Sequence, residues 1–215
     1  MLEIDFDRIR SDLDLLRKAR GKIKVFGAEA HGFQMNAPLP EATVHQFEQQ
    51  NGIALPSDYR EFLIRIGNGG AGPYYGVFKL GEMDKGWEQA SWKECSDFVG
   101  CLSKPFPHTQ EWNDLNGRPD CDEGDEAEYE KQLAAFEQRY FNSEIVNGAI
   151  PICHTGCAIR HWLVVTGVEA GNMWCDGRAN DSGLYPLQQE GIPRFTFYAW
   201  YRRWLDEALG KLPSA

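Results

Sequence analysis

Residues 55–80 read LPSDYREFLIRIGNGGAGPYYGVFKL and contain the strongest structural pattern in the chain. Ser57 and Asp58 are residue types that favour the first turn of a helix, and the apolar residues after them recur at helical spacing. The glycine-rich residues 67–70 end that helix, because glycine accepts the left-handed backbone of a helix end. A turn and the β-branched, aromatic residues 74–80 follow, so the stretch predicts a helix, a glycine-rich exit and a strand.

Two further helices are predicted on the N-terminal side of this stretch. Pro40 and Gly52 bracket a run with apolar residues on one face, which predicts a helix that forms a hairpin with the helix described above. Residues 2–20 carry an apolar stripe at helical spacing, and residues 22–37 read as an irregular arm. We therefore expect residues 1–38 to form an N-terminal helical extension.

The last third of the sequence predicts a sheet followed by a helix. Three β-rich runs at 149–152, 161–167 and 172–176 are separated by glycine-containing turns, and such short connections imply antiparallel pairing. The final helix carries an aromatic stripe at three- and four-residue steps, formed by Phe197, Trp200, Tyr201, Trp204 and Leu205. Residues 84–147 precede this sheet as a long acidic insertion, with one helix near 126–141.

These elements predict the α+β class, as a single domain over residues 1–215. The sheet is expected to be largely antiparallel or mixed, with the C-terminal aromatic helix packed on it. A chain of 215 residues is long enough for one sizeable core, and its composition shows no linker. Its 42% hydrophobic and 25% charged residues are typical of a folded protein.

The formal charge of −10 indicates which partners are disfavoured. A negative field repels phosphate backbones and anionic headgroups, so we expect neither nucleic acid nor a membrane surface as a ligand. The sequence contains no apolar run of the roughly 20 residues that cross a bilayer, and it opens without an export leader. The expected location is the cytoplasm, where the six cysteines would stay reduced.

The strongest candidate for a metal or thiol site is the group of Cys153, Cys157 and His161. Zinc binds thiolates and imidazoles tetrahedrally, but structural sites present two ligand pairs, and the second pair is poorly defined here. Free cysteines most often pack as small hydrophobic residues, and no sequence signature of a hydrolase or cysteine protease is present. We therefore expect no metal, no cofactor and no catalytic residue, with a zinc- or thiol-dependent enzyme as the remaining alternative.

Residues 120–130 contain seven acids and no base. They do not match a calcium loop, because the sixth and twelfth positions counted from Asp120 are Asp125 and Lys131. Two interpretations remain open. In the first, the acids are exposed to solvent and stabilise the positive N-terminal end of the next helix. In the second, they form an acidic patch that binds a basic partner.

The aromatic content of the chain favours a protein-binding surface. Its 7 Trp, 8 Tyr and 12 Phe are large rigid side chains that dominate interfaces as well as cores. We hypothesise a partner-binding surface formed by Trp87, Trp92 and Trp112 together with Asp120, Asp122, Glu123 and Asp125. The alternative for each tryptophan is partial burial in the core.

The ordered blocks of the sequence resemble the SUKH superfamily, the Smi/Knr family of cell-wall-regulator-like proteins. The first block comprises Leu55, Pro56, Tyr59, Phe62, Leu63, Gly67, Asn68, Gly69, Gly70, Gly72 and Pro73. Later blocks are residues 150–152, 156–157, 163–167 and 171–174 and the closing aromatic helix. The resemblance spans residues 39–209, and its main departure is the long acidic region 84–147.

This resemblance implies an α+β fold without enzymatic activity. In bacteria it implies an immunity protein that binds and neutralises a polymorphic toxin, so the expected partner is a toxin domain. The fungal relatives imply an alternative role as a regulatory or scaffold protein.

Overall fold

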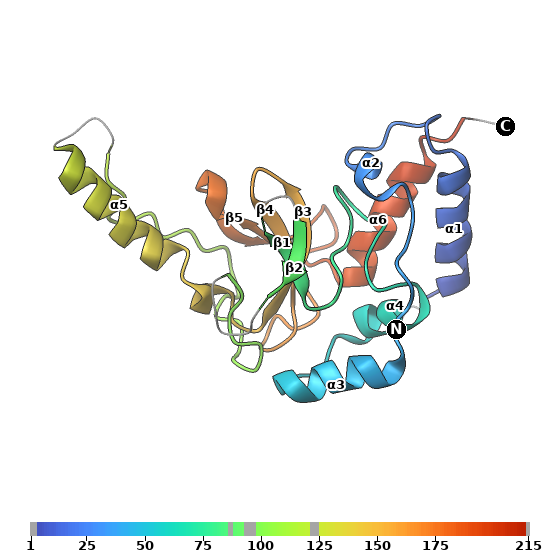
Figure 1. The fold of residues 1–215 in the computed structure, drawn as a ribbon, viewed down its shortest axis with the longest axis horizontal. Helices are drawn as coiled ribbons and strands as arrows, with labels where there is room; N and C mark the ends of the chain where they lie inside the picture. The colour runs from blue at the N-terminus through green and yellow to red at the C-terminus, as the bar shows by residue number, and fades with distance from the viewer. Residues whose placement is uncertain (1–3, 86–87, 93–97, 121–124, 214–215) are drawn as a thin grey trace.

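A four-stranded antiparallel sheet lies at the centre of the protein (Figure 1). Its strands neighbour one another in chain order: β3 (Ala149–Gly156), β4 (Ile159–Val164), β5 (Met173–Gly177) and β6 (Gly183–Pro186). The computed structural model that shows this arrangement describes residues 4–85, 88–92, 98–120 and 125–213. The antiparallel pairing predicted from the short glycine-containing turns is confirmed, as is the α+β class.

Helix α6 (Phe197–Leu209) lies beside this sheet with its aromatic stripe buried (Figure 1). Its first and fifth residues, Phe197 and Tyr201, pack edge-on against Phe62 of α4 (Ser57–Arg65), at ring-centroid distances of 4.9 and 4.8 Å. Aromatic rings bury the largest area per side chain and gain further from such edge contacts. The predicted packing of a C-terminal aromatic helix on the sheet is confirmed.

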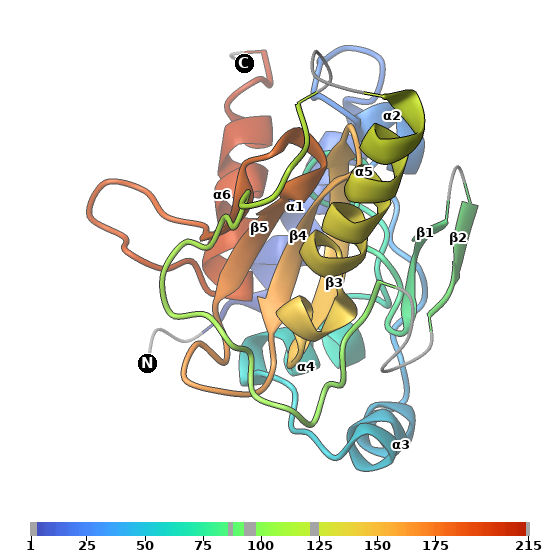
Figure 2. The same cartoon turned by 90° about the vertical axis from the view of Figure 1, so that its left-hand side faces the viewer.

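Helix α1 (Phe6–Lys18) packs against α6 on the side away from the sheet (Figure 1, Figure 2). Its buried apolar residues belong to the same hydrophobic core as the sheet: Phe6, Ile9, Leu13 and Leu16. Asp12, which is only 8% exposed, accepts a 2.5 Å hydrogen bond from the guanidinium of Arg202 on α6. Apolar burial and a partly buried ion pair therefore join the N-terminal helix to the C-terminal one.

The predicted helical hairpin is formed by α3 (Glu41–Asn51) and α4. Gly52 ends α3 with a left-handed backbone, at φ 63°, as expected for a helix C-terminus. Arg60 of α4 reaches back to Glu48 of α3, with 3.4 Å between Nε and Oε2. The arm before this hairpin contains one short helix, α2 (Ala28–His31).

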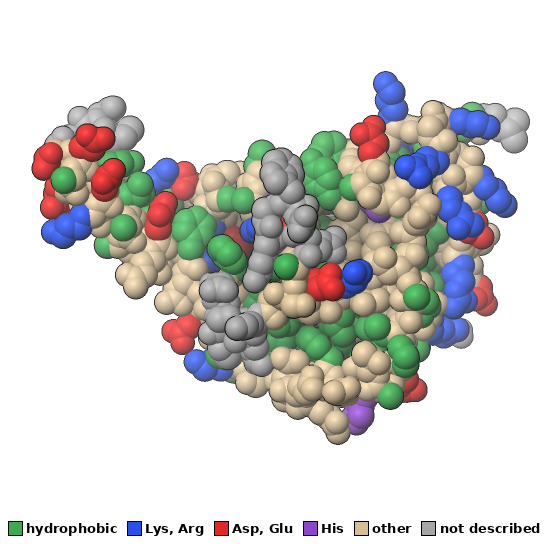
Figure 3. Space-filling model, viewed as in Figure 1, with side chains coloured by type: hydrophobic (Ala, Val, Ile, Leu, Met, Phe, Trp, Pro, Cys, Tyr) green, Lys and Arg blue, Asp and Glu red, His purple; other side chains and the backbone are tan. Residues whose placement is uncertain are grey.

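The acidic insertion contains a hairpin and a projecting helix. The hairpin pairs β1 (Glu82–Lys85) with β2 (Glu88–Ser91), and the helix predicted near 126–141 is α5 (Glu126–Tyr140). In α5 the buried side chains are Phe136 and Tyr140, near its C-terminal end. The start of α5 extends away from the body of the protein, and Asp and Glu side chains lie over it (Figure 1, Figure 3).

The strand predicted at 74–80 is wrong. Tyr74 and Tyr75 lie in a turn, and only Val77 makes β-bridges, with Gly70 and with Cys153 of β3. The reason is backbone geometry, because the φ angle of Tyr74 is +54°, which lies outside the extended region. The tyrosines are therefore presented on a loop.

We expect α1 to be part of the cooperative core, and two adjacent leucines test this. Leu16 is fully buried and Leu15 is 47% exposed. Leu16→Ala should lower the free energy of unfolding by about 2–5 kcal/mol because it leaves a cavity, whereas Leu15→Ala should change it by less than about 0.5 kcal/mol. Urea unfolding of both variants measures the difference, and equal effects would contradict the placement of α1.

Candidate functional site

Three aromatic side chains gather on one surface of the protein. Phe26, Tyr74 and Tyr75 are 64%, 37% and 43% exposed. The ring of Phe26 packs edge-on against both tyrosines, at centroid distances of 6.2 Å to Tyr74 and 5.7 Å to Tyr75. Contiguous exposed apolar groups of this kind mark interaction sites more often than scattered ones do. We call these three residues the aromatic patch.

Two glycines allow the segments of the aromatic patch to approach each other. A Cβ atom at Gly27 would lie 2.0 Å from the carbonyl oxygen of Tyr74, so no other residue fits without moving the backbone. Gly76 has a φ of +100°, and a Cβ there would lie 2.5 Å from the carbonyl oxygen of Gly70. The close contact of these loops therefore depends on glycine at both positions.

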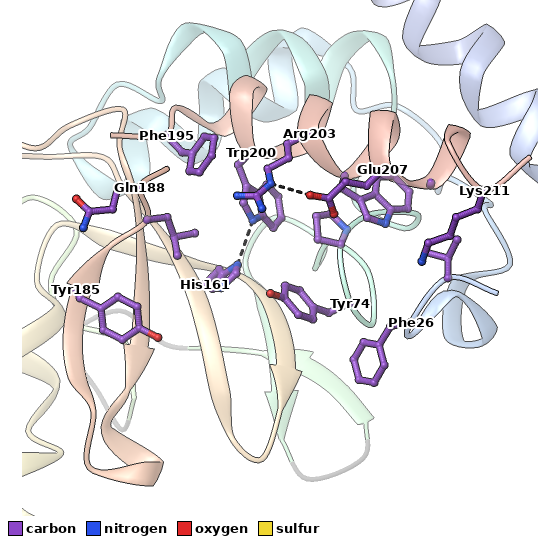
Figure 4. Close-up of a pocket in the computed structure, with 15 residues that line it drawn as sticks. Phe26, Tyr74, His161, Tyr185, Gln188, Phe195, Trp200, Arg203, Glu207 and Lys211 are labelled. Carbon is purple, nitrogen blue, oxygen red and sulfur yellow. Dashed lines mark hydrogen bonds and ion pairs between the residues drawn. The ribbon is translucent and has the colours of Figure 1, made fainter. Parts of the chain in front are cut away.

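A cleft of about 360 Å³ lies beside the aromatic patch (Figure 4). Phe26 and Tyr74 line it on one side, and Trp200 of α6 lines it on the other. His161 of β4 lies between Tyr74 and Trp200, as Figure 4 shows, and Tyr185 of β6 contributes a further aromatic ring. The cleft is thus an extension of the aromatic patch towards the sheet.

His161 is held as a neutral hydrogen-bond acceptor in this cleft. Its Nδ1 accepts a 3.1 Å hydrogen bond from the indole N–H of Trp200, and its ring lies edge-on to Tyr74 at 5.3 Å. Burial lowers the pKa of His161 to about 4, because the charged form would lose its solvation. The imidazole is therefore engaged by Trp200 and resists protonation.

The polar groups of the cleft come from α6. The guanidinium of Arg203 pairs with the carboxylate of Glu207 one turn later, at 2.8 Å, and also lies 5.7 Å from the ring centre of Phe195 (Figure 4). Trp204 is only 7% exposed, and its indole N–H has no acceptor among the described residues. A buried donor without an acceptor is uncommon, and this nitrogen is itself buried, so it is not offered to the surface of the cleft.

The cysteine and histidine candidates differ in their exposure. Cys153 and His161 face each other in the register of β3 and β4, and both are buried, whereas Cys157 is exposed in the turn between the strands. Burial raises the pKa of the Cys153 thiol well above its usual value, which disfavours the thiolate. Within the described residues, no group of three or more His, Cys, Asp or Glu side chains is placed to hold a metal ion.

The residues hypothesised to bind a partner occupy separate places. Trp92 is partly buried and packs edge-on against Phe47 of α3, at 6.1 Å. Trp112 is also partly buried and stacks on Tyr140 of α5 at 5.5 Å. Asp120 and Asp125 are exposed, whereas Trp87, Asp122 and Glu123 lie outside the described residues. The contacts of Trp92 and Trp112 are on different helices, so that hypothesis stays a prediction.

Patterns in the sequence do not reveal the aromatic patch. They predict a strand at 74–80, and Phe26 lies in an arm without regular periodicity. One sequence feature does point to it, because two adjacent tyrosines between Pro73 and Gly76 stand in a segment rich in turn-forming residues.

Comparison with known proteins gives one match. The model of the SMI1 / KNR4 family (SUKH-1) matches residues 38–186, which is more than half of the chain. No match was found among curated proteins, and none among solved structures. The matched range contains the sheet and the α3–α4 hairpin, while α1, α2 and α6 lie outside it.

The pH dependence of stability tests the environment of His161. The unfolded chain protonates this residue near pH 6.5 and the folded one near pH 4, so the free energy of unfolding falls as the pH drops through that interval. In the variant His161→Gln the amide oxygen can still accept from Trp200. Between pH 6.5 and pH 4 the free energy of unfolding of this variant should fall by about 3 kcal/mol less than that of the wild type.

The matched control is His45→Gln, because the His45 side chain is 62% exposed on α3. Unfolding free energies at pH 6.5 and pH 4 for the wild type and both variants give the comparison. If His161→Gln loses as much stability as the wild type over this interval, the buried neutral imidazole is not responsible.

Proposed function

Because the chain belongs to the SMI1/KNR4 family (SUKH-1), we propose that it is a non-enzymatic protein-binding module, and specifically an immunity protein that neutralises a bacterial toxin. The family includes immunity proteins and cell-wall regulators. In the proposed mechanism the protein occludes the functional surface of the toxin, and the aromatic patch supplies the central contacts.

The observation on which this proposal rests is the exposure of Phe26, Tyr74 and Tyr75 beside a cleft lined by further aromatic rings. A few large side chains contribute most of the binding energy at protein interfaces, and Tyr and Trp are enriched among them. Here Gly27 and Gly76 let the loops that present these rings pack closely against their neighbours. Contacts that exist before binding lower the entropic cost of binding.

The state of the titratable groups supports a binding role over a catalytic one. A general base needs a free lone pair and a pKa near the working pH, whereas Nδ1 of His161 is engaged by Trp200 and the pKa of His161 is about 4. A thiol nucleophile needs the thiolate, which burial of Cys153 disfavours. Arg203 and Glu207 neutralise each other on α6.

We propose the cytoplasm as the site of action. Among the described helices none has the length and apolar character of a membrane span. Cys101 is disulfide-bonded in the structure, so the expectation that all six thiols stay reduced is wrong at this position. Disulfides are rare in reducing compartments, and the location is therefore best tested directly by fractionating cells that express the protein.

Co-expression with a toxin domain encoded by a neighbouring gene tests the proposed function. Cells that make both proteins should survive, and continued killing would contradict the immunity role. Cys157→Ser should protect as well as the wild type, because the proposal gives this exposed thiol no role. If affinity purification instead recovers stable endogenous proteins and no toxin, the regulatory alternative is favoured.

Truncation of the aromatic patch should weaken toxin binding without unfolding the protein. Phe26→Ala and Tyr75→Ala should each cost about 2 kcal/mol of binding free energy or more, which is about thirtyfold in Kd. Isothermal titration calorimetry with the purified toxin domain measures the loss. Both side chains are too exposed for their removal to leave a large cavity.

The matched control is Phe98→Ala, because Phe98 is 54% exposed and is not among the residues that line the cleft. Trp92→Ala and Trp112→Ala test the other hypothesised surface in the same assay. Loss of affinity in those variants, with wild-type affinity for Phe26→Ala and Tyr75→Ala, would move the binding site away from the aromatic patch.

A further inference from the structure

The charge of the protein is unevenly distributed. The chain carries a formal charge of −10, yet between residues 15 and 40 the only acid is Glu29, against five bases in residues 17–24. Figure 3 shows Lys and Arg side chains gathered over α1 and the end of the chain, and Asp and Glu side chains over the projecting part of α5. The acidic and basic regions thus lie at opposite ends of the long axis.

Five exposed cations lie in residues 18–24 and at position 211. None of them takes part in an ion pair with another described residue, in contrast to Arg17 and Arg203, which pair with Asp14 and Glu207. We call these five side chains the basic rim: Lys18, Arg20, Lys22, Lys24 and Lys211. All five are exposed, so their charges are available to an anionic group.

Lys24 and Lys211 connect the basic rim to the aromatic cleft. Lys24 directly precedes Val25 and Phe26, which both line the cleft, and Lys211 itself lines it from the end of the chain after α6. Figure 4 shows Lys211 on the same side of the cleft as Phe26. At physiological salt, charges act over about 8 Å, so a group in the cleft is influenced by this rim far more than by the distant acids of α5.

The cleft therefore combines aromatic walls with positive charge at one place. Phe26, Tyr74 and Trp200 supply the rings, and Lys211 lines the cleft beside them.

We infer that the cleft binds a segment of a partner protein that carries Asp or Glu beside an exposed aromatic or aliphatic side chain. The apolar side chain enters between Phe26, Tyr74 and Trp200, and the carboxylates face the basic rim. This inference rests on the proposed protein-binding function and specifies the chemistry of the partner. It differs from the expectation of a basic partner, which derives from the acids at 120–130. Three of those acids, Glu126, Glu128 and Glu130, belong to α5.

Single-stranded nucleic acid is the other polymer that combines negative charge with groups that stack on aromatic rings. It is disfavoured because its negative charges are spread evenly along its whole length. A long polyanion would therefore be repelled by the protein, whose total formal charge is −10. A short acidic peptide segment interacts mainly with the local cations. The experiment below separates the two.

Selection of random linear peptides on phage against the intact protein tests the inference. The enriched peptides should share an apolar or aromatic residue flanked by Asp or Glu, and their affinity should fall as salt is raised. Enrichment of basic peptides, or no enrichment at all, would overturn the inference. A single-stranded oligodeoxythymidine should not displace the selected peptide, and displacement by it would overturn the inference in favour of nucleic acid.

Charge reversal locates the site. The double variant Lys24→Glu, Lys211→Glu should weaken binding of the selected peptide by about tenfold or more, because like charges then face each other. The matched control is Lys131→Glu, which reverses a 78% exposed lysine on α5 and should leave the affinity unchanged. Equal affinity of the double variant and the wild type would overturn the inference. Both rim lysines are exposed, and thermal melts verify the fold.

The toxin protection assay distinguishes failure of this inference from failure of the proposed function. If the double variant protects cells as well as the wild type, the proposed function stands, and the inference that the toxin binds through an acidic segment is wrong. If acidic peptides bind the wild type through the basic rim but the toxin is not neutralised, the inference stands and the immunity role is wrong.

Discussion

Burial of the aromatic face of α6 is the constraint on which the rest of the structure depends. Tyr201 is fully buried, packs against Phe62 of α4 at 4.8 Å and donates a 2.9 Å hydrogen bond from its hydroxyl to the carbonyl of Ala71. One residue thus joins the last helix to the hairpin and to the loop after it. A buried hydroxyl must find an acceptor, so this contact fixes the position of Ala71 relative to α6.

The same helix connects the core to the proposed recognition surface. Ala71 is followed within three residues by Tyr74, whose ring stands at the cleft, while Trp200 next to Tyr201 forms the opposite wall. Gly70 and Val77 exchange two backbone hydrogen bonds, of 2.9 and 2.8 Å, that close the loop between them. Core packing therefore sets the geometry of the cleft, and the surface is formed before any partner arrives.

Local patterns in the sequence predicted the regular elements but not the site. Helical periodicity located α1, α4 and α6, because each buries a stripe that repeats at helical spacing. The aromatic patch instead depends on a positive φ at Tyr74 and on contact with Phe26, almost fifty residues earlier, and neither leaves a periodic pattern. The net charge of the whole chain likewise did not predict the basic rim, because a sum over all residues does not say where the charges lie.

The central claim is that this family member works through a recognition surface centred on the loops at 22–27 and 73–76. Amide hydrogen exchange of the protein, free and bound to its toxin, tests it most directly, because it reports which backbone segments the partner covers. The account predicts that protection on binding is concentrated in these two loops. Protection confined to the segments around Trp92 and Trp112, with unchanged exchange at 22–27 and 73–76, would contradict it.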